Sequence, residues 1–146
     1  MARQRKSLDG EARSEERLFR HRYGELVEAV TADESFVTRI AFGCLSCYLH
    51  GRLKLVLADG KPPWDGVLLP TAAEHHASLR RSLPALRVHP VLGKWLYLPA
   101  SAESFEDDAR ELAALALADD PRVGVEPSAR RSRARAPRTR QRRSRR

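Results

Sequence analysis

The last nineteen residues of the chain, 128–146, cannot contribute to a hydrophobic core. They hold ten arginines and no acidic residue, and apart from one proline they hold no apolar side chain larger than alanine. A segment of this composition buries too little apolar surface to offset the entropy lost on ordering, so we expect it to be disordered. The ten are Arg130, Arg131, Arg133, Arg135, Arg138, Arg140, Arg142, Arg143, Arg145 and Arg146. Any fold must come from the residues before this tail, which we divide into a flexible start, 1–10, and one domain, 11–127.

The tail also carries the net charge of the chain. The chain has 27 basic and 19 acidic residues, a formal charge of +8. The tail holds ten of the basic residues, which leaves 17 basic and all 19 acidic residues, a formal charge of −2, for residues 1–127. Arginine favours bidentate contacts with phosphate, so the tail predicts nonspecific, salt-sensitive binding to nucleic acid or another polyanion. The alternative is an extension that only keeps the chain in solution and binds nothing in particular.

Length and cysteine content limit the class of protein. The segment 11–127 is long enough for one compact domain and too short for two ordinary ones. Cys44 and Cys47 are the only cysteines, so a disulfide framework is not expected. No apolar run is long enough to span a bilayer, and the basic, polar start does not have the pattern of a secretory signal. We therefore expect a soluble cytoplasmic protein that does not enter a membrane.

Hydrophobic periodicity predicts an α+β fold, in which helices at the start, middle and end of the domain flank a small antiparallel meander. The expected helices cover 11–30, 71 to about 82, and a last stretch that begins at Ser101 or Ser104. The expected strands are 37–49, 53–57 and 67–69, with turns at 50–51 and 59–60, and 88–98 is expected to be extended.

Five aromatic and polar residues form a candidate pocket at predicted loops and strand ends. They are Trp64, His89, Lys94, Trp95 and Tyr97. Such a set can line a ligand pocket or stack on a nucleic-acid base. The alternative is that the aromatic rings close the rim of the core and leave their polar tips in water.

Other chemistry-bearing patterns favour structural roles. Cys44 and Cys47 have the Cys-x-x-Cys spacing, but residues three apart in a strand face opposite sides, so we expect them to be structural. His75 and His76 are adjacent, whereas a helical metal pair is usually spaced i, i+4. Acidic residues at 106–108 suit the start of a helix. The sequence has no glycine-rich phosphate loop and no motif around a nucleophilic serine, so we expect no catalytic residue, no cofactor and no metal.

The segment 37–53 resembles the N-terminal domain of the TfoX/Sxy family. That family shows an Arg-x-Met-Phe-Gly-Gly pattern followed by an aromatic residue, a glycine turn and an apolar strand. Here Arg39, Phe42 and Gly43 match the pattern, whereas Ala41 replaces the methionine and Cys44 the second glycine. The segment 95–99, Trp-Leu-Tyr-Leu-Pro, looks like the family's Tyr-x-x-x-Pro entry into its last helix.

This resemblance covers roughly residues 11–118 and extends to the related YjbR-like group. It implies a small α+β domain and a role in regulation, and it brings no catalytic residues. Pro62, Pro63 and Trp64 lie outside the family pattern, and the arginine tail stands where full-length TfoX proteins have a separate helical domain.

These observations lead to two functional hypotheses and a third, weaker one. The first is a non-enzymatic binding or regulatory module, a TfoX-like domain with a polycationic arm for nucleic acid. The alternative is an interaction module whose meander or aromatic rim docks a protein partner, with an incidental tail. An enzyme ranks third, because it would need polar groups that converge in one pocket.

Overall fold

A six-stranded antiparallel sheet forms the centre of the computed structural model, which describes residues 13–126. The strands are β1 (Val37–Ala41), β2 (Cys44–Leu49), β3 (Arg52–Asp59), β4 (Asp65–Leu69), β5 (Arg87–Val88) and β6 (Leu96–Pro99). They lie in the order β1-β2-β3-β4-β6-β5, and every neighbouring pair is antiparallel. Only β4 and β6 are neighbours in the sheet without being consecutive in the chain, because β5 forms its outer edge beyond β6.

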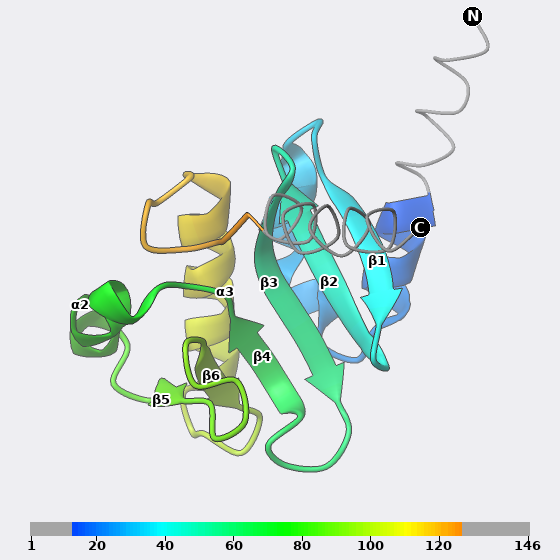
Figure 1. The fold of residues 1–146 in the computed structure, drawn as a ribbon. Coiled ribbons are helices and arrows are strands. Elements are labelled where there is room, and N and C mark those ends of the chain that lie inside the picture. Colours follow the sequence, from blue (N-terminus) through cyan, green and yellow to red (C-terminus); the bar gives the residue numbers. More distant parts are fainter. Residues whose placement is uncertain (1–12, 127–146) are drawn as a thin grey trace, which may run out of the picture.

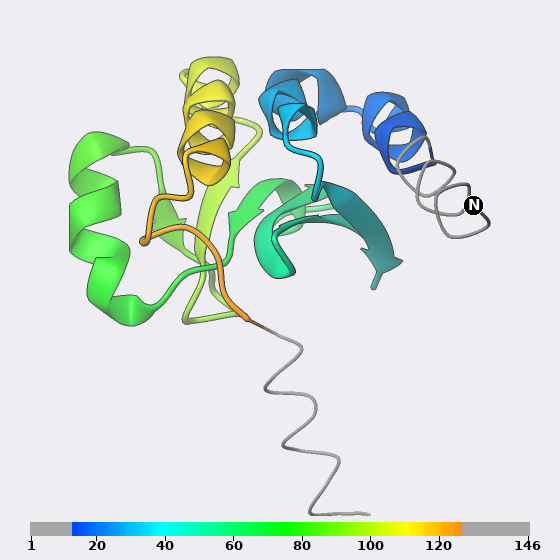
Figure 2. The same cartoon turned by 90° about the horizontal axis from the view of Figure 1, so that it is seen from above.

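Helices cover one face of this sheet and leave the other without a helix. Residues 13–20 are helical, and η1 (Gly24–Ala32) and α3 (Phe105–Leu117) pack over the sheet beside each other, as Figure 2 shows from above. The short helices η2 (Ala73–His75) and α2 (His76–Ser82) lie at the β5 side of the sheet. The face turned toward the viewer in Figure 1 carries none of the described helices. The predicted α+β class with flanking helices is confirmed.

The sheet has more strands than the sequence predicted, because the expected strand 37–49 is a hairpin. Phe42 and Gly43 form its two-residue turn, and both have left-handed backbone conformations, with φ of 53° and 75°. Such turns match the twist of antiparallel strands and usually contain Asn-Gly or Asp-Gly. A phenylalanine in the first position hid the turn. The expected turn at His50 and Gly51 has the same geometry, with φ of 53° and 74°.

The first helix is also shorter than expected. Helical structure stops at residue 20, and the chain bends before η1 begins at Gly24. A Cβ atom on Gly24 would lie 1.6 Å from the carbonyl oxygen of Leu18, so only glycine permits this close approach. Leu18, Val27 and Val30 are buried, whereas Phe19 is about half exposed.

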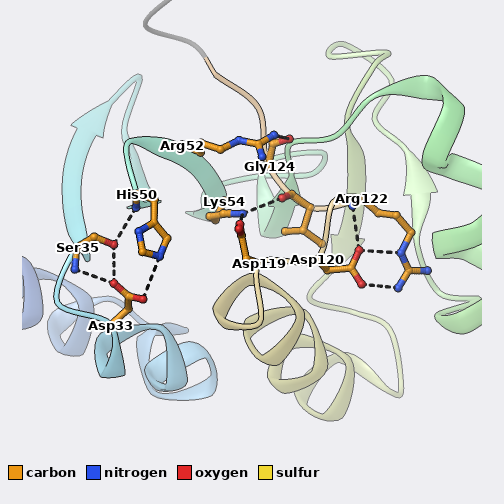
Figure 3. A network of polar contacts seen from close by, with 10 residues as sticks. Asp33, Ser35, His50, Arg52, Lys54, Asp119, Asp120, Arg122 and Gly124 are labelled. Carbon is orange, nitrogen blue, oxygen red and sulfur yellow. Dashed lines mark hydrogen bonds and ion pairs between the residues drawn. The ribbon is translucent and has the colours of Figure 1, made fainter.

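The chain after α3 forms a strap, residues 119–126, that returns to the sheet (Figure 3). The Lys54 ammonium, which is fully buried, donates to Asp119 Oδ1 at 2.7 Å and to the Val123 carbonyl at 3.2 Å. Leu53 and Val125 exchange two backbone hydrogen bonds of 2.9 and 3.0 Å. The described chain therefore ends against the start of β3.

Two expectations lie outside the described residues: a flexible segment 1–10 and a disordered tail 128–146. Within residues 13–126, no helix has the length and apolar character needed to cross a bilayer.

Candidate binding groove

A cavity of about 550 Å³ hollows the face of the sheet that no described helix covers. Its floor consists of side chains from β2, β3 and β4, and its walls come from the β1–β2 turn and from the loops before β4 and β6. The lining residues are Ala41, Phe42, Cys44, Ser46, Tyr48, Leu53, Val56, Trp64, Leu68, Leu92 and Trp95. We call this cavity the groove.

The β2 part of the floor consists of the residues that alternate with the core residues of this strand. Leu45, Cys47 and Leu49 point into the core below the helices, whereas the alternate residues of the strand line the groove. A strand that is buried on both faces usually reads as a nearly continuous apolar run, and in β2 this run is interrupted by Ser46. The sequence contains the signal for this second apolar face, but one strand cannot show which side a helix covers.

A β-bulge at Lys54 in β3 changes which face of the sheet the residues on either side of it point to. Tyr48 pairs with Leu53 and Cys47 with Leu55, so Lys54 is an extra residue on β3. As a result Leu53 lines the groove and Leu55 enters the core, although residues two apart in a regular strand face the same side. The bulge also directs the Lys54 side chain toward the strap.

Trp64 and Trp95 form walls of the groove, each from a tight loop. The backbone N–H of Trp64 donates to the Lys61 carbonyl at 2.7 Å, and the backbone N–H of Gly60 donates to the Trp64 carbonyl at 2.7 Å. The Trp95 N–H donates to Leu92 O at 2.7 Å. Both tryptophans belonged to the candidate pocket predicted from the sequence, and the structure brings them to the same cavity.

His89 lies behind these walls and connects the two loops. Its buried ring sits 4.6 Å from the Trp64 ring and 5.4 Å from the Tyr97 ring, centroid to centroid. Nδ1 accepts from the N–H groups of Val91 and Leu92 at 3.0 and 2.9 Å, so Nε2 carries the proton and donates to Pro63 O at 2.9 Å. Burial lowers the pKa of His89, which favours this neutral ring. His89 therefore positions the groove and does not line it.

Tyr97 and Lys94 also lie outside the lining of the groove. Tyr97 is buried in the cluster below it and donates its hydroxyl to the Asp65 carboxylate. Burial, followed by the Asp65 interactions, raises the pKa of Tyr97 well above its usual value. Lys94 is exposed, and its carbonyl oxygen lies 2.8 Å from Nε2 of His76. The sequence placed all five candidate residues together, but only the two tryptophans face the cavity.

Sequence reasoning missed Phe42, which stands at the rim of the groove. Its side chain is 99% exposed, although phenylalanine is strongly apolar. Its left-handed backbone is unfavourable for a bulky residue, since Cβ crowds the neighbouring carbonyl. The available signal was the neighbouring Gly43, because a single glycine inside a strand-like segment can mark a break in the strand.

The two cysteines occupy opposite faces of β2. Cys44 lines the groove, whereas Cys47 is fully buried in the core under the helices. Burial raises the pKa of both thiols, to about 12 for Cys47. Both are free cysteines in the protonated form at neutral pH, which lacks the nucleophilicity of a thiolate.

A Ser, His and Asp cluster lies at the far end of the sheet but lacks the geometry of a catalytic triad (Figure 3). The Ser35 hydroxyl donates to Asp33 Oδ1 at 2.7 Å and accepts from the His50 backbone N–H at 2.8 Å. His50 Nε2 contacts Asp33 Oδ2 at 3.1 Å. The serine therefore bonds to the carboxylate and not to the imidazole, so no base activates it. The cluster fastens the loop before β1 to the β2–β3 turn.

The part of the chain between residues 13 and 126 holds no group of three or more His, Cys, Asp or Glu side chains placed to bind a metal ion. The ten arginines proposed to contact nucleic acid lie outside that part. Comparison with models of protein families, with curated proteins and with solved structures found no match to this chain. The resemblance to the TfoX/Sxy N-terminal domain therefore stays a prediction that depends on the quoted motifs alone.

Proposed function

We propose that this protein is a non-enzymatic binding module that holds nucleic acid or a similar polyanion through its arginine tail. The observation that carries the proposal is the charge division, +10 on residues 128–146 against −2 on residues 1–127. A regulatory role belongs to the proposal through the TfoX-like motifs. A cytoplasmic location belongs to it as well, supported by two free thiols in the folded part.

The groove supports binding over catalysis. Its walls and floor are mainly aromatic and aliphatic, and its one thiol is protonated at neutral pH. A surface of this kind offers contact area and shape, whereas a catalytic site needs polar groups that converge on a reacting atom.

Replacing all ten tail arginines with glutamine tests the proposal, because length and polarity are kept while the charge is removed. Each phosphate contact releases condensed counterions, so the logarithm of the affinity for duplex DNA falls by about 0.9 per contact per unit of log salt. We expect a slope of about 4 to 8 for the wild-type protein, since geometry prevents ten simultaneous contacts. Mobility-shift titrations at several salt concentrations measure this slope.

A matched control is the double variant Arg20→Gln and Arg110→Gln, which removes two exposed arginines from helices of the folded part. It should keep nearly all of the affinity and slope. If the variant with all ten tail arginines replaced by glutamine binds as tightly as wild type, the proposed function is wrong and the recognition surface lies on the folded domain.

A second function, docking of a protein partner, is favoured by one observation, the exposed Phe42 beside an apolar groove. An apolar anchor next to a pocket is typical of the centre of a protein interface. If neither the wild type nor the tail variant binds polyanions, this second function becomes the better explanation of the groove.

A further inference from the structure

Aromatic rings surround the groove. Phe42 comes from the β1–β2 turn, Tyr48 from β2, Trp64 from the loop before β4 and Trp95 from the loop before β6. Rings that come from four separate segments line this one cavity and give a planar ligand an aromatic surface to contact. Nucleic-acid bases are planar and stack on aromatic side chains whatever their identity.

Phe42 is difficult to explain by folding alone. It gains little from burial, because it is 99% exposed, and its left-handed φ of 53° is strained for a residue of its size. Strained residues that persist in a structure cluster at binding sites. Here the strain holds an aromatic ring at the rim of the groove.

The size and polarity of the groove suit bases. Its volume of about 550 Å³ lies within the range of small-ligand sites. Its lining offers three polar side chains, Ser46, Cys44 and Tyr48, and no carboxylate. Stacking with so few polar partners discriminates little between bases, so no sequence preference is expected.

The arginine tail is attached at the edge of this groove. Val125 packs against the same buried cluster that supplies Leu53, Val56 and Leu68 to the groove. It also pairs with Leu53 through the backbone. The chain passes from Glu126 directly into 127–146. A strand held by the tail therefore presents its bases to the groove at a high effective concentration. Arg39 is a further cation at this face, with Cζ 5.7 Å from the centre of the Tyr48 ring.

We propose that the groove stacks unpaired bases of a single-stranded nucleic acid whose phosphates the arginine tail holds. This inference rests on the proposed function and adds the strandedness of the ligand. Duplex bases are already stacked on one another and cannot enter the groove, so a duplex binds through the tail only. A protein partner or a second copy would use the groove without needing the adjacent tail, so the observations favour a single strand.

The chain contains a reporter for this test. It has two tryptophans, and both line the groove, so tryptophan emission reports on that site alone. The full chain is titrated with a short single-stranded DNA, with the duplex formed by its complement, and with an abasic strand of the same length. We expect the intact single strand to quench the emission, and the duplex and abasic strands to bind without quenching it.

Variants of the rings separate stacking from phosphate contact. Trp95→Leu and Phe42→Ala should each weaken binding of the intact strand by about tenfold, in line with the loss of one stacked base, and leave binding of the abasic strand unchanged. Phe42 is exposed, so its variant tests the site without threatening the fold. Phe19→Leu, an exposed aromatic on the first helix and outside the groove, is the matched control and should change neither affinity.

The outcomes distinguish this inference from the function it rests on. Equal affinity for the intact and abasic strands, with no quenching, overturns base stacking and leaves tail binding standing. If the variant with all ten tail arginines replaced by glutamine binds the single strand with undiminished affinity and still shows quenching, stacking is supported and the role of the tail is overturned. Emission that changes with protein concentration alone, without nucleic acid, identifies a second copy as the occupant and overturns the inference.

Discussion

At the residue scale, the neutral imidazole of His89 determines where the two tryptophans stand. It binds the loop of Trp64 through Pro63 and the loop of Trp95 through two backbone N–H groups. The sequence could place both tryptophans near one another, because aromatic residues at strand ends often share a pocket. It could not show that His89 would turn inward and Lys94 outward, since that choice depends on hydrogen bonds between loops far apart in the chain.

His89→Gln should lower the free energy of unfolding by about 2 to 3 kcal/mol, because the three hydrogen bonds of this ring and its aromatic contacts cannot all be replaced. The pKa of His89 lies below its ordinary value of 6.5 in the folded protein. The stabilisation that comes from the neutral His89 ring is therefore fully present above pH 6.5 and is lost as the pH falls through the lower pKa of the folded protein. Urea unfolding at pH values from neutral to about 5 should show this loss in wild type.

In His89→Gln, the free energy of unfolding should change less over the same pH range than it does in wild type. His21 is a half-buried histidine whose pKa burial also lowers, so part of the pH dependence will remain. His76→Gln, which changes a half-buried histidine bonded to Lys94 O, is the control for removal of a histidine and should cost less stability at neutral pH than His89→Gln. A slope identical in wild type and His89→Gln would contradict the role given to His89.

At the element scale, the strap after α3 depends on a polar device that periodicity does not reveal. Asp120 accepts from the backbone N–H, Nε and a terminal nitrogen of Arg122, each at 2.9 Å, and Arg122 also donates to Ser78 on α2. The long apolar patterns of α3 and β2 were readable from the sequence. The bulge at Lys54 was not, because a buried lysine inside a run of leucines has the alternation of an ordinary strand.

Asp120→Asn should destabilise the protein at neutral pH by about 1 kcal/mol, a figure reduced for the solvent screening of a partly exposed pair. The Arg122 hydrogen bond, with smaller contributions from its backbone and charge, lowers the pKa of Asp120 to about 2. The stabilisation that the ionised Asp120 gains from Arg122 is thus fully present above pH 3.8, the ordinary pKa of the carboxyl, and is lost as the pH falls toward 2. Denaturation at neutral and acid pH should show the gap between variant and wild type closing in acid.

Asp107→Asn is the matched control, because this exposed carboxylate on α3 lies 3.8 Å from Arg110 and contributes little. A loss in Asp107→Asn equal to that in Asp120→Asn would show that general surface charge, and not the strap contact, is responsible.

At the scale of the whole molecule, composition separated the tail from the domain, and periodicity gave the α+β class. The uncovered sheet face was not foreseeable, because apolar residues on both sides of a strand indicate burial without saying what does the burying. Two helices, η1 and α3, lie side by side on one face, and the strap returns to the start of the interior strand β3. Only the folded chain assigns one apolar face to the core and the other to a groove.

Limited trypsin digestion should remove residues from the tail first and leave a resistant fragment close to 13–126, since cleavage requires chain that can unfold locally. Mass spectrometry of the products over time measures the order of cuts. Added polyphosphate should slow the tail cuts, because bound arginines are shielded, and should not alter cuts in the domain. A tail that is cut no faster than the domain would show that it is packed.

The attachment of the tail also sets a path for mechanical load. A polymer that pulls on residues beyond Glu126 pulls first on Val125, which two backbone hydrogen bonds hold against Leu53. Gly124 N–H donates to Pro70 O at 2.8 Å and the Thr71 hydroxyl to Arg122 O at 2.6 Å behind this pair, so we expect a pull on the tail to peel the strap from the sheet before β3 gives way. Peeling also uncovers the Lys54 ammonium, which is buried while the strap is in place.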